Sequence, residues 1–411
     1  MSPRTINTSM KKITFYYDIV CPYAYIASQR IRAVAARCGA TVVWTPVLLG
    51  GIYKSIDAPQ VPSQTWSAAK ARLGALDLHR QADYHGVSLR FPAEHPRRSV
   101  SAMRLLVGVE GPEREALSHA LYQAYWVDGA DISDRGVLDE IARRHGVDPA
   151  IIDSPQTRAA LFETTAAAVA DGAFGVPSMV VDGVMWWGQD RLHLVEHALT
   201  GGMLRTPQTP AGTHGGTLRF FHDFSSPFSY LASTQIARIA ERQGAVVQWM
   251  PILLGGLFRN IGTPDVPMLT MTKAKQDYVR RDLSDWADWW GVPFSFPTTF
   301  PVRTVLPLRV SIAEPAAIPH LYRALWAEDR DIGSPAVVAA VLAEAGLDGE
   351  GLIRRAGEAD VKAVLRANTE AAEAAGVCGV PTVEIGGEFI WGQDRLEQVE
   401  AVLCGTWAVP A

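Results

Sequence analysis

The sequence is an imperfect tandem duplication, and this feature constrains its fold more than any other. Pro46–Gly51, P-V-L-L-G-G, returns as Pro251–Gly256, P-I-L-L-G-G, at an offset of 251 − 46 = 205. Trp187–Leu192, W-G-Q-D-R-L, returns unchanged as Trp391–Leu396 at an offset of 391 − 187 = 204. Because the matches keep their order and so long a period, they indicate two whole domains rather than a solenoid of short repeats.

We predict a first half over 12–202, a linker over 203–216 and a second half over 217–405. The linker's Pro, Gly and Thr content is typical of a connecting segment. A chain of 411 residues with 48% hydrophobic content can bury a separate core in each half.

Each half has the pattern of an α/β domain. In the first, an aromatic and β-branched strand (13–17) precedes a helical spacing that ends at Gly39 and a strand before Pro46, which implies a parallel pair. The region 53–170 is mostly helical in pattern, and it is followed by a hairpin (178–187) that turns at Asp182–Gly183 and by a last helix (190–199). We therefore expect one mixed sheet, formed by the first and last parts, with a large helical insertion.

The first strand-to-helix turn carries the residues best suited to chemistry. It reads D-I-V-C-P-Y-A-Y over Asp18–Tyr25 and D-F-S-S-P-F-S-Y over Asp223–Tyr230. The first N–H groups of a helix lack partners and lie at the positive end of its dipole, so the turn favours an anion. A thiol there ionises more easily, and a hydroxyl there can donate to a bound thiolate. Cys21 and Ser226 are our candidate catalytic residues.

Composition and cysteine usage limit the other classes of function. The formal charge of −5 argues against a general nucleic-acid binder, and no apolar run reaches the length of a membrane span or a signal peptide. We expect a soluble, cytoplasmic protein with no membrane partner. Four scattered cysteines without a C-x-x-C pair argue against a disulfide framework, and we expect Cys378 to be a buried, inert thiol.

One pattern is typical of a metal site. His193–His197 matches H-x-x-E-H, in which two helical histidines bind zinc. The second half has Glu397 and Ala401 at the two histidine positions, so we predict no metal.

The order of these motifs resembles the thioredoxin superfamily. The helical insertion narrows the resemblance to the DsbA-like branch, which contains periplasmic disulfide oxidoreductases, kappa-class glutathione transferases and 2-hydroxychromene-2-carboxylate isomerases. D-F-S-S-P-F-S-Y in the second half is close to the isomerase opening, and G-V-P and W-G-Q-D-R-L in both halves resemble its closing motifs. The resemblance implies two tandem thioredoxin-like domains, each a mixed β-sheet with a large helical insertion.

It also implies glutathione as the cofactor. In this family the serine maps onto Ser226 and holds the glutathione thiolate. A cis Val–Pro bond is expected in each half, with the valine backbone pairing with the tripeptide, and the Gln-Asp pair after Trp-Gly receives the γ-glutamyl end. The implied cofactor-binding residues are Val176, Pro177, Gln189 and Asp190 in the first half, and Val380, Pro381, Gln393 and Asp394 in the second.

The implied activity is that of a glutathione-dependent isomerase of the 2-hydroxychromene-2-carboxylate type, acting on a small aromatic substrate in a catabolic pathway. Two alternatives stay open: a kappa-like glutathione transferase or monothiol disulfide oxidoreductase that uses Cys21, and a non-catalytic glutathione-binding scaffold. Family members are usually homodimers, so the resemblance also implies that the two halves pack as an internal pseudo-dimer.

The first half departs from the isomerase pattern. Cys21 replaces the serine, and Ala24 stands where a dithiol oxidoreductase needs its second cysteine, so no intramolecular disulfide can form in this motif. Cys21 is then a low-pKa monothiol, a substitute for serine at the thiolate site, or part of a half kept for structure.

Overall fold

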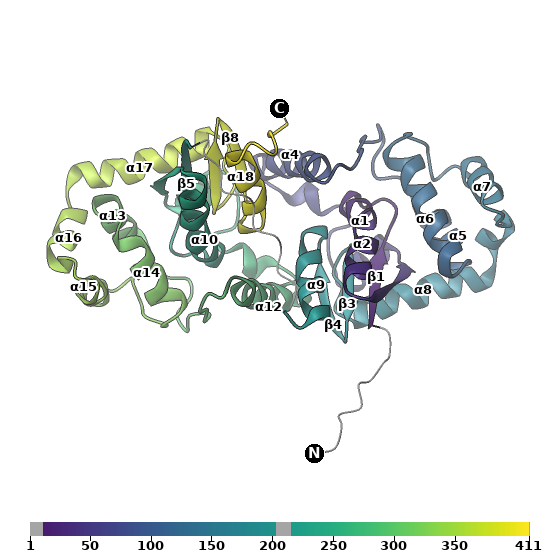
Figure 1. The fold of residues 1–411 in the computed structure, drawn as a ribbon, viewed down its shortest axis with the longest axis horizontal. Coiled ribbons are helices and arrows are strands. Elements are labelled where there is room, and N and C mark those ends of the chain that lie inside the picture. Colours follow the sequence, from purple (N-terminus) through teal and green to yellow (C-terminus); the bar gives the residue numbers. More distant parts are fainter. Residues whose placement is uncertain (1–10, 203–214, 411) are drawn as a thin grey trace, which may run out of the picture. The chain divides into compact units, whose positions relative to one another are not determined.

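The computed structural model describes residues 11–202 and 215–410, which divide into two compact units (Figure 1). The first unit runs up to Pro62 and resumes at Gln81. The second contains Ser63–Arg80 together with the described residues from 215 onward. Most of the predicted linker lies outside the described residues, and the assignment of Ser63–Arg80 to the second unit was not predicted.

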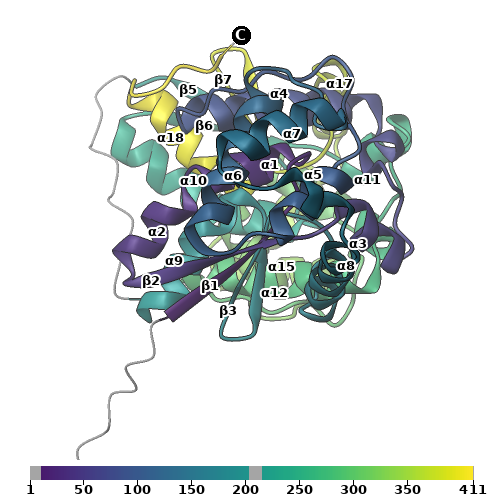
Figure 2. The same ribbon diagram turned by 90° about the vertical axis from the view of Figure 1, so that its right-hand side faces the viewer.

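The first unit has one four-stranded mixed sheet, as predicted. Its strands are β1 (Lys11–Tyr17), β2 (Ala40–Pro46), β3 (Ser178–Val181) and β4 (Val184–Trp187), in the order β2-β1-β3-β4. β1 pairs parallel with β2 and antiparallel with β3, and Figure 2 shows these three strands side by side. Asp182 and Gly183 both have positive φ, which confirms the two-residue hairpin turn.

The predicted helical insertion is confirmed. α5 to α8 form a lobe beside the sheet in Figure 1. The single helical pattern predicted after the first turn is in fact two helices, α1 and α2. The helices around the first sheet are α1 (Pro22–Ser28), α2 (Ile31–Arg37), α3 (Leu49–Ser55), α5 (Val100–Val107), α6 (Gly111–Trp126), α7 (Arg135–Arg144), α8 (Pro155–Ala170) and α9 (Leu192–Thr200). α4 (Ala68–Tyr84) spans the boundary between the two units at Arg80.

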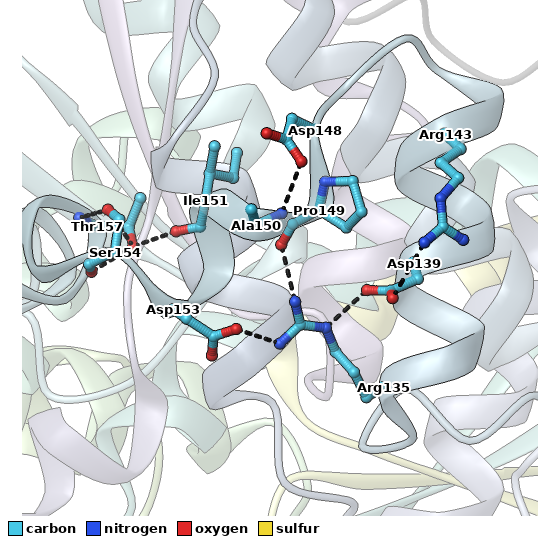
Figure 3. Close-up of polar contacts among 10 residues, drawn as sticks. All are labelled: Arg135, Asp139, Arg143, Asp148, Pro149, Ala150, Ile151, Asp153, Ser154 and Thr157. Atoms are coloured by element: carbon cyan, nitrogen blue, oxygen red, sulfur yellow. Dashed lines mark hydrogen bonds and ion pairs between the residues drawn. The ribbon is translucent and has the colours of Figure 1, made fainter.

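Short polar contacts fix the corner between α7 and α8 (Figure 3). Arg135 donates to Asp139 and Asp153, both at 2.6 Å, and to the Pro149 carbonyl at 3.1 Å. The Ser154 hydroxyl accepts the Thr157 N–H at 3.1 Å and so caps α8. The corner sets the direction of α8, which leads the chain back toward β3.

The second unit repeats the plan. Its sheet has the order β6-β5-β7-β8, from β5 (Thr217–His222), β6 (Val246–Pro251), β7 (Thr382–Ile385) and β8 (Glu388–Trp391). One continuous helix, α10, occupies the place of α1 and α2. The helices are α10 (Pro227–Gln243), α11 (Leu254–Asn260), α12 (Lys273–Trp290), α13 (Val305–Ala313), α14 (Ala317–Trp326), α15 (Pro335–Glu344), α16 (Gly349–Ala356), α17 (Ala359–Ala374) and α18 (Leu396–Leu403).

A buried indole joins the helical lobe to the motif turn in each unit. Trp126 Nε1 donates to the Ile19 carbonyl at 2.8 Å, and Trp326 Nε1 donates to the Phe224 carbonyl at 2.8 Å. Both indoles are 0% exposed. These hydrogen bonds therefore connect the helical lobe of each unit to its motif turn. Within the described ranges, no helix combines the length and hydropathy that a membrane span needs.

Candidate active site

A buried aspartate organises the motif turn in each half. Asp18 is 1% exposed; its backbone carbonyl accepts the Cys21 N–H at 3.1 Å, and its carboxylate accepts the Leu49 N–H at 2.9 Å. Asp223 makes the same two contacts, with the Ser226 N–H at 3.1 Å and the Leu254 N–H at 2.8 Å. In each half, the backbone and carboxylate of one aspartate thus tie the turn to the start of α3 or α11.

The burial of these aspartates has an electrostatic consequence. Desolvation raises the pKa of Asp18 to about 6, although hydrogen bonds from Leu49 and Ser99 act in the opposite direction. Desolvation likewise raises the pKa of Asp223.

Ser226 lies at the strand-to-helix turn, as the motif predicts. It is the N-cap of α10: its hydroxyl oxygen accepts the Ser229 N–H at 3.1 Å. The same hydroxyl donates to the Val380 carbonyl at 3.0 Å. Its side chain therefore joins the N-terminus of a 17-residue helix to the Val-Pro loop.

Cys21 lies at the equivalent point but behaves differently. Its thiol donates to the Val176 carbonyl at 3.1 Å, and it makes no capping hydrogen bond to α1. Burial raises the pKa of Cys21 to about 12, and the N–H groups of Ala24 and Tyr23 lower it only in part. This direction is opposite to the one that a low-pKa monothiol requires. The Cys21 thiol is neutral at physiological pH.

The Val–Pro bonds are cis in both halves, at Val176–Pro177 and at Val380–Pro381, as predicted. Two further cis bonds, His95–Pro96 and Phe300–Pro301, were not anticipated from the sequence. The Pro177 carbonyl accepts the Gly188 N–H at 2.9 Å, and the Pro381 carbonyl accepts the Gly392 N–H at 3.0 Å.

These contacts bring the three motifs of the second half together. The Ser226 hydroxyl donates a hydrogen bond to the Val380 carbonyl. The carbonyl of the next residue, Pro381, accepts from the N–H of Gly392, which precedes the Gln393–Asp394 pair. Gly392 has φ +114°, a conformation that favours glycine, and it turns the chain into the 3-10 helix Gln393–Arg395.

In the first half, Gln189 occupies the corresponding place and is 1% exposed. Its side-chain amide donates to the Gln81 side-chain oxygen at 2.7 Å, and its backbone carbonyl accepts from Arg30 at 3.2 Å. Asp190 forms an ion pair with Arg191 at 3.1 Å. This Asp–Arg pair has a counterpart in the second half, between Asp394 and Arg395.

Sequence reasoning missed one participant in the second half, Asp77 of α4. Its carboxylate accepts from Arg395 Nε at 2.6 Å and from Arg395 Nη2 at 2.9 Å, and Arg395 also pairs with Asp394 at 3.2 Å. Asp77 precedes Arg395 by 318 residues, and nothing local in the sequence signals the contact. A residue of the first half therefore lies beside the Gln-Asp pair of the second.

The remaining cysteines and the His193–His197 pattern form no disulfide or metal-binding group among the described residues. Cys378 is 4% exposed and burial raises its pKa to about 12, in agreement with an inert thiol. The four cysteines, all within the described ranges, are free. Across those ranges, His193 and His197 included, no three His, Cys, Asp or Glu side chains are grouped as metal ligands.

Comparison with known proteins gives the family. The family model described as a DSBA-like thioredoxin domain matches the chain twice, over residues 12–200 and 217–403. The chain belongs to the DsbA-like thioredoxin family. Its two domains each carry the mixed four-stranded sheet and the large helical insertion.

The relatives of this DsbA-like protein are enzymes of two kinds. It is 30% identical to the 2-hydroxychromene-2-carboxylate isomerase of Pseudomonas putida over 45% of this chain and 92% of that protein. It is 28% identical to the glutathione S-transferase kappa 2 of Caenorhabditis elegans, over 47% of this chain and 94% of that one. A solved 2-hydroxychromene-2-carboxylate isomerase is 29% identical, with a TM-score of 0.42 over 46% of this chain and 94% of that one. Each relative corresponds to about half of the chain.

Proposed function

We propose that the protein is a glutathione-dependent isomerase of the 2-hydroxychromene-2-carboxylate type, with Ser226 as the residue that activates glutathione. The observation that carries the proposal is the position of the Ser226 hydroxyl, at the first turn of α10 and 3.0 Å from the Val380 carbonyl. The family match and the isomerase relatives support it.

The residues of the second half fit glutathione as the cofactor. A soft thiolate near neutral pH needs a hydrogen-bond donor and local positive potential, and Ser226 at the start of α10 offers both. The backbone of Val380, beside cis-Pro381, lies next to this hydroxyl and suits the cysteinyl peptide group. Asp394 is a carboxylate partner for the γ-glutamyl ammonium, with Gln393 beside it.

The proposed reaction consumes no glutathione. Bound glutathione would supply a thiolate that adds to a conjugated carbon–carbon double bond of a small aromatic substrate, which becomes a single bond, and a carbon–oxygen bond of the ring would open. Rotation about the former double bond would follow, and the double bond would then re-form in its other geometry as the thiolate leaves. Ser226 donates its hydrogen bond to the sulfur whenever the sulfur carries the negative charge, so it stabilises both the attacking and the leaving thiolate.

The structure gives less support to the redox alternative. A monothiol oxidoreductase needs a thiolate, and the Cys21 thiol is held neutral by burial. We therefore place the isomerase chemistry at Ser226. A glutathione transferase acting through the same serine differs from the proposal in its product, a stable glutathione conjugate.

The test is a turnover assay with 2-hydroxychromene-2-carboxylate and glutathione present in less than molar equivalence to the substrate. We expect many turnovers per glutathione, and we expect Ser226→Ala to lower kcat/KM by about 100-fold, as the loss of one donor to a developing anion does elsewhere. Ser233→Ala is the matched control, because its hydroxyl lies on the same helix and bonds the Tyr230 carbonyl.

Three results would contradict the proposal. A glutathione conjugate as the final product would make the protein a transferase. Full activity in Ser226→Ala would move the chemistry to another residue. Glutathione binding without turnover on any substrate of this class would favour the non-catalytic scaffold.

A further inference from the structure

The two halves differ in a paired way at two equivalent positions. Cys21 corresponds to Ser226, and Tyr53 corresponds to Phe258, at the same offset of 205 (226 − 21 and 258 − 53). The first half therefore has a thiol and a phenol where the second has a hydroxyl and a phenyl ring. In each half, one of the two positions carries a hydroxyl group.

In each half, the scaffold ties the helix that carries Tyr53 or Phe258 to the turn that carries Cys21 or Ser226. The Asp18 backbone carbonyl accepts a hydrogen bond from the Cys21 N–H, and the Asp18 carboxylate accepts one from the Leu49 N–H. Tyr53 is four residues after Leu49 in α3, one helical turn on and on the same face. In the second half, Asp223 bonds Ser226 and Leu254 in the same way, and Phe258 is four residues after Leu254 in α11.

The electrostatics of Tyr53 agree with this placement. Burial raises the pKa of Tyr53 first, and Cys21 and Asp18 raise it further in their ionised forms, so the phenol lies within electrostatic range of both groups. The phenol is protonated at neutral pH and is a hydrogen-bond donor. Tyr53 is only half-buried, whereas Phe258 is 8% exposed.

Cys21 itself is a poor replacement for Ser226. Its thiol is a weak donor, and it does not cap α1. If the first half binds a thiolate, the donor comes from another side chain.

We propose that the Tyr53 hydroxyl takes, in the first half, the part that Ser226 takes in the second: it donates a hydrogen bond to the thiolate of glutathione held at the Val176 loop. This inference rests on the proposed function, because it needs glutathione to bind in the first half. It makes the first half a second thiolate site with a phenol as donor.

A second phenol in the region does not explain the difference between the halves. Tyr122 is 0% exposed and packs between the rings of Tyr17 and Tyr25, with centroids at 6.1 and 5.4 Å. Its counterpart Tyr322 is equally buried. Since both halves have this hydroxyl and neither exposes it, Tyr53 is the hydroxyl that distinguishes the first.

The experiment measures the pKa of bound glutathione in full-length variants, from the ultraviolet difference absorbance of the thiolate, and measures glutathione affinity by calorimetry. Ser226→Ala leaves the first half as the only activating site. Adding Tyr53→Phe should raise the bound thiol's pKa by about one to two units, roughly 10- to 100-fold less thiolate at a given pH, which is the scale of one hydrogen bond to a charged group. Adding Phe258→Tyr to that double variant should return thiolate through the second half.

The matched control is Ser226→Ala with Tyr16→Phe, which removes a phenol that donates to Asp171 in the same unit. It should titrate like Ser226→Ala alone. Unchanged titration on adding Tyr53→Phe, with affinity retained, would overturn the inference and leave the proposed function standing. Absence of glutathione binding in the unsubstituted protein would overturn both.

Discussion

Among single residues, Asp18 has the most distinctive expected response to pH. Its pKa is about 6 in the folded chain, against an ordinary value of 3.8. Between these values the folded chain keeps a proton that the unfolded chain has released, so the free energy of unfolding falls as the pH rises from about 4 to about 6. The loss of stability caused by ionising buried Asp18 is complete above its pKa in the folded chain. It is absent below its pKa in the unfolded chain.

Asp18→Asn should remove this pH dependence. The stability of the unsubstituted protein relative to the variant should fall by on the order of 2–3 kcal/mol between pH 4 and pH 7, and urea unfolding at each pH measures it. Leu49 and Ser99 both donate to Asp18 Oδ2, and an amide nitrogen at that position accepts from neither, so the variant should be the less stable of the two at pH 4. Asp265→Asn, at an exposed position, should show no such trend. If the stability of the unsubstituted protein relative to Asp18→Asn rose with pH, the raised pKa of Asp18 would be contradicted.

At this scale, sequence reasoning found the residues that stand inside contiguous motifs. Cys21 and Ser226 were predicted at the turns where they lie, and the two cis Val–Pro bonds were predicted as well. The neutral state of the Cys21 thiol was not predictable, because it depends on how much of the fold covers the sulfur. Tyr53 lies in no motif, and its placement one turn after Leu49, whose N–H donates to Asp18, came only from the structure.

Among the short elements, the turn before the Gln393–Asp394 pair should tolerate little change. Gly392 has φ +114°, and a Cβ added there would lie 2.5 Å from Asp394 Oδ1. Gly392→Ala should therefore cost about 1–3 kcal/mol and should weaken glutathione binding by displacing Asp394. Thermal unfolding and calorimetric titration measure the two effects.

Gly255→Ala is the control for that change, because Gly255 lies inside α11 with no heavy atom within 4 Å of the added Cβ. It should be neutral or slightly stabilising. An equal loss of stability in both variants would show that the φ of Gly392 is not the cause.

Caps and surface ion pairs should contribute unequally at the corner between α7 and α8. Ser154→Ala removes the N-cap bond to Thr157 and should cost about 1 kcal/mol. Arg135→Ala removes contacts to Asp139 and Asp153, but the Arg135 side chain is 44% exposed, so the expected cost is about 0–1 kcal/mol. Chemical unfolding of the two variants compares them. A larger loss for Arg135→Ala would mean that the ion pairs, rather than the cap, hold the corner.

At the scale of the whole molecule, the second unit depends on a segment of the first half. Arg395 is a largely buried cation, and Asp77 is its bidentate partner. Asp77→Asn should lower the stability of the second unit by about 1.5–3 kcal/mol, and the loss should appear as faster hydrogen exchange in β8, next to the Arg80–Phe389 contact.

Asp277→Asn is the matched control, since it removes a carboxylate whose pair with Lys273 is exposed and lies within one helix. It should cost less than about 0.5 kcal/mol. If β8 exchanges at an unchanged rate in Asp77→Asn, Ser63–Arg80 is not an integral part of the second unit.

The fold of each half was largely predictable, because the duplication supplies two sequences for one plan. The short apolar runs on either side of the Asp182–Gly183 turn gave the hairpin, and the apolar run before the motif turn gave the first strand of the sheet. The division of α4 between the units was not predictable, because it rests on contacts such as Asp77–Arg395 that join distant parts of the chain. Local patterns specify elements, and tertiary contacts decide which unit an element joins.

The most direct test of the account is a crystal structure of the full chain with glutathione. We predict glutathione in the second half with its sulfur in hydrogen-bond range of the Ser226 hydroxyl, its cysteinyl backbone paired with Val380 and its γ-glutamyl group at Asp394. Absence of glutathione from the second half, or glutathione bound there with its sulfur turned away from Ser226, would contradict the role assigned to Ser226.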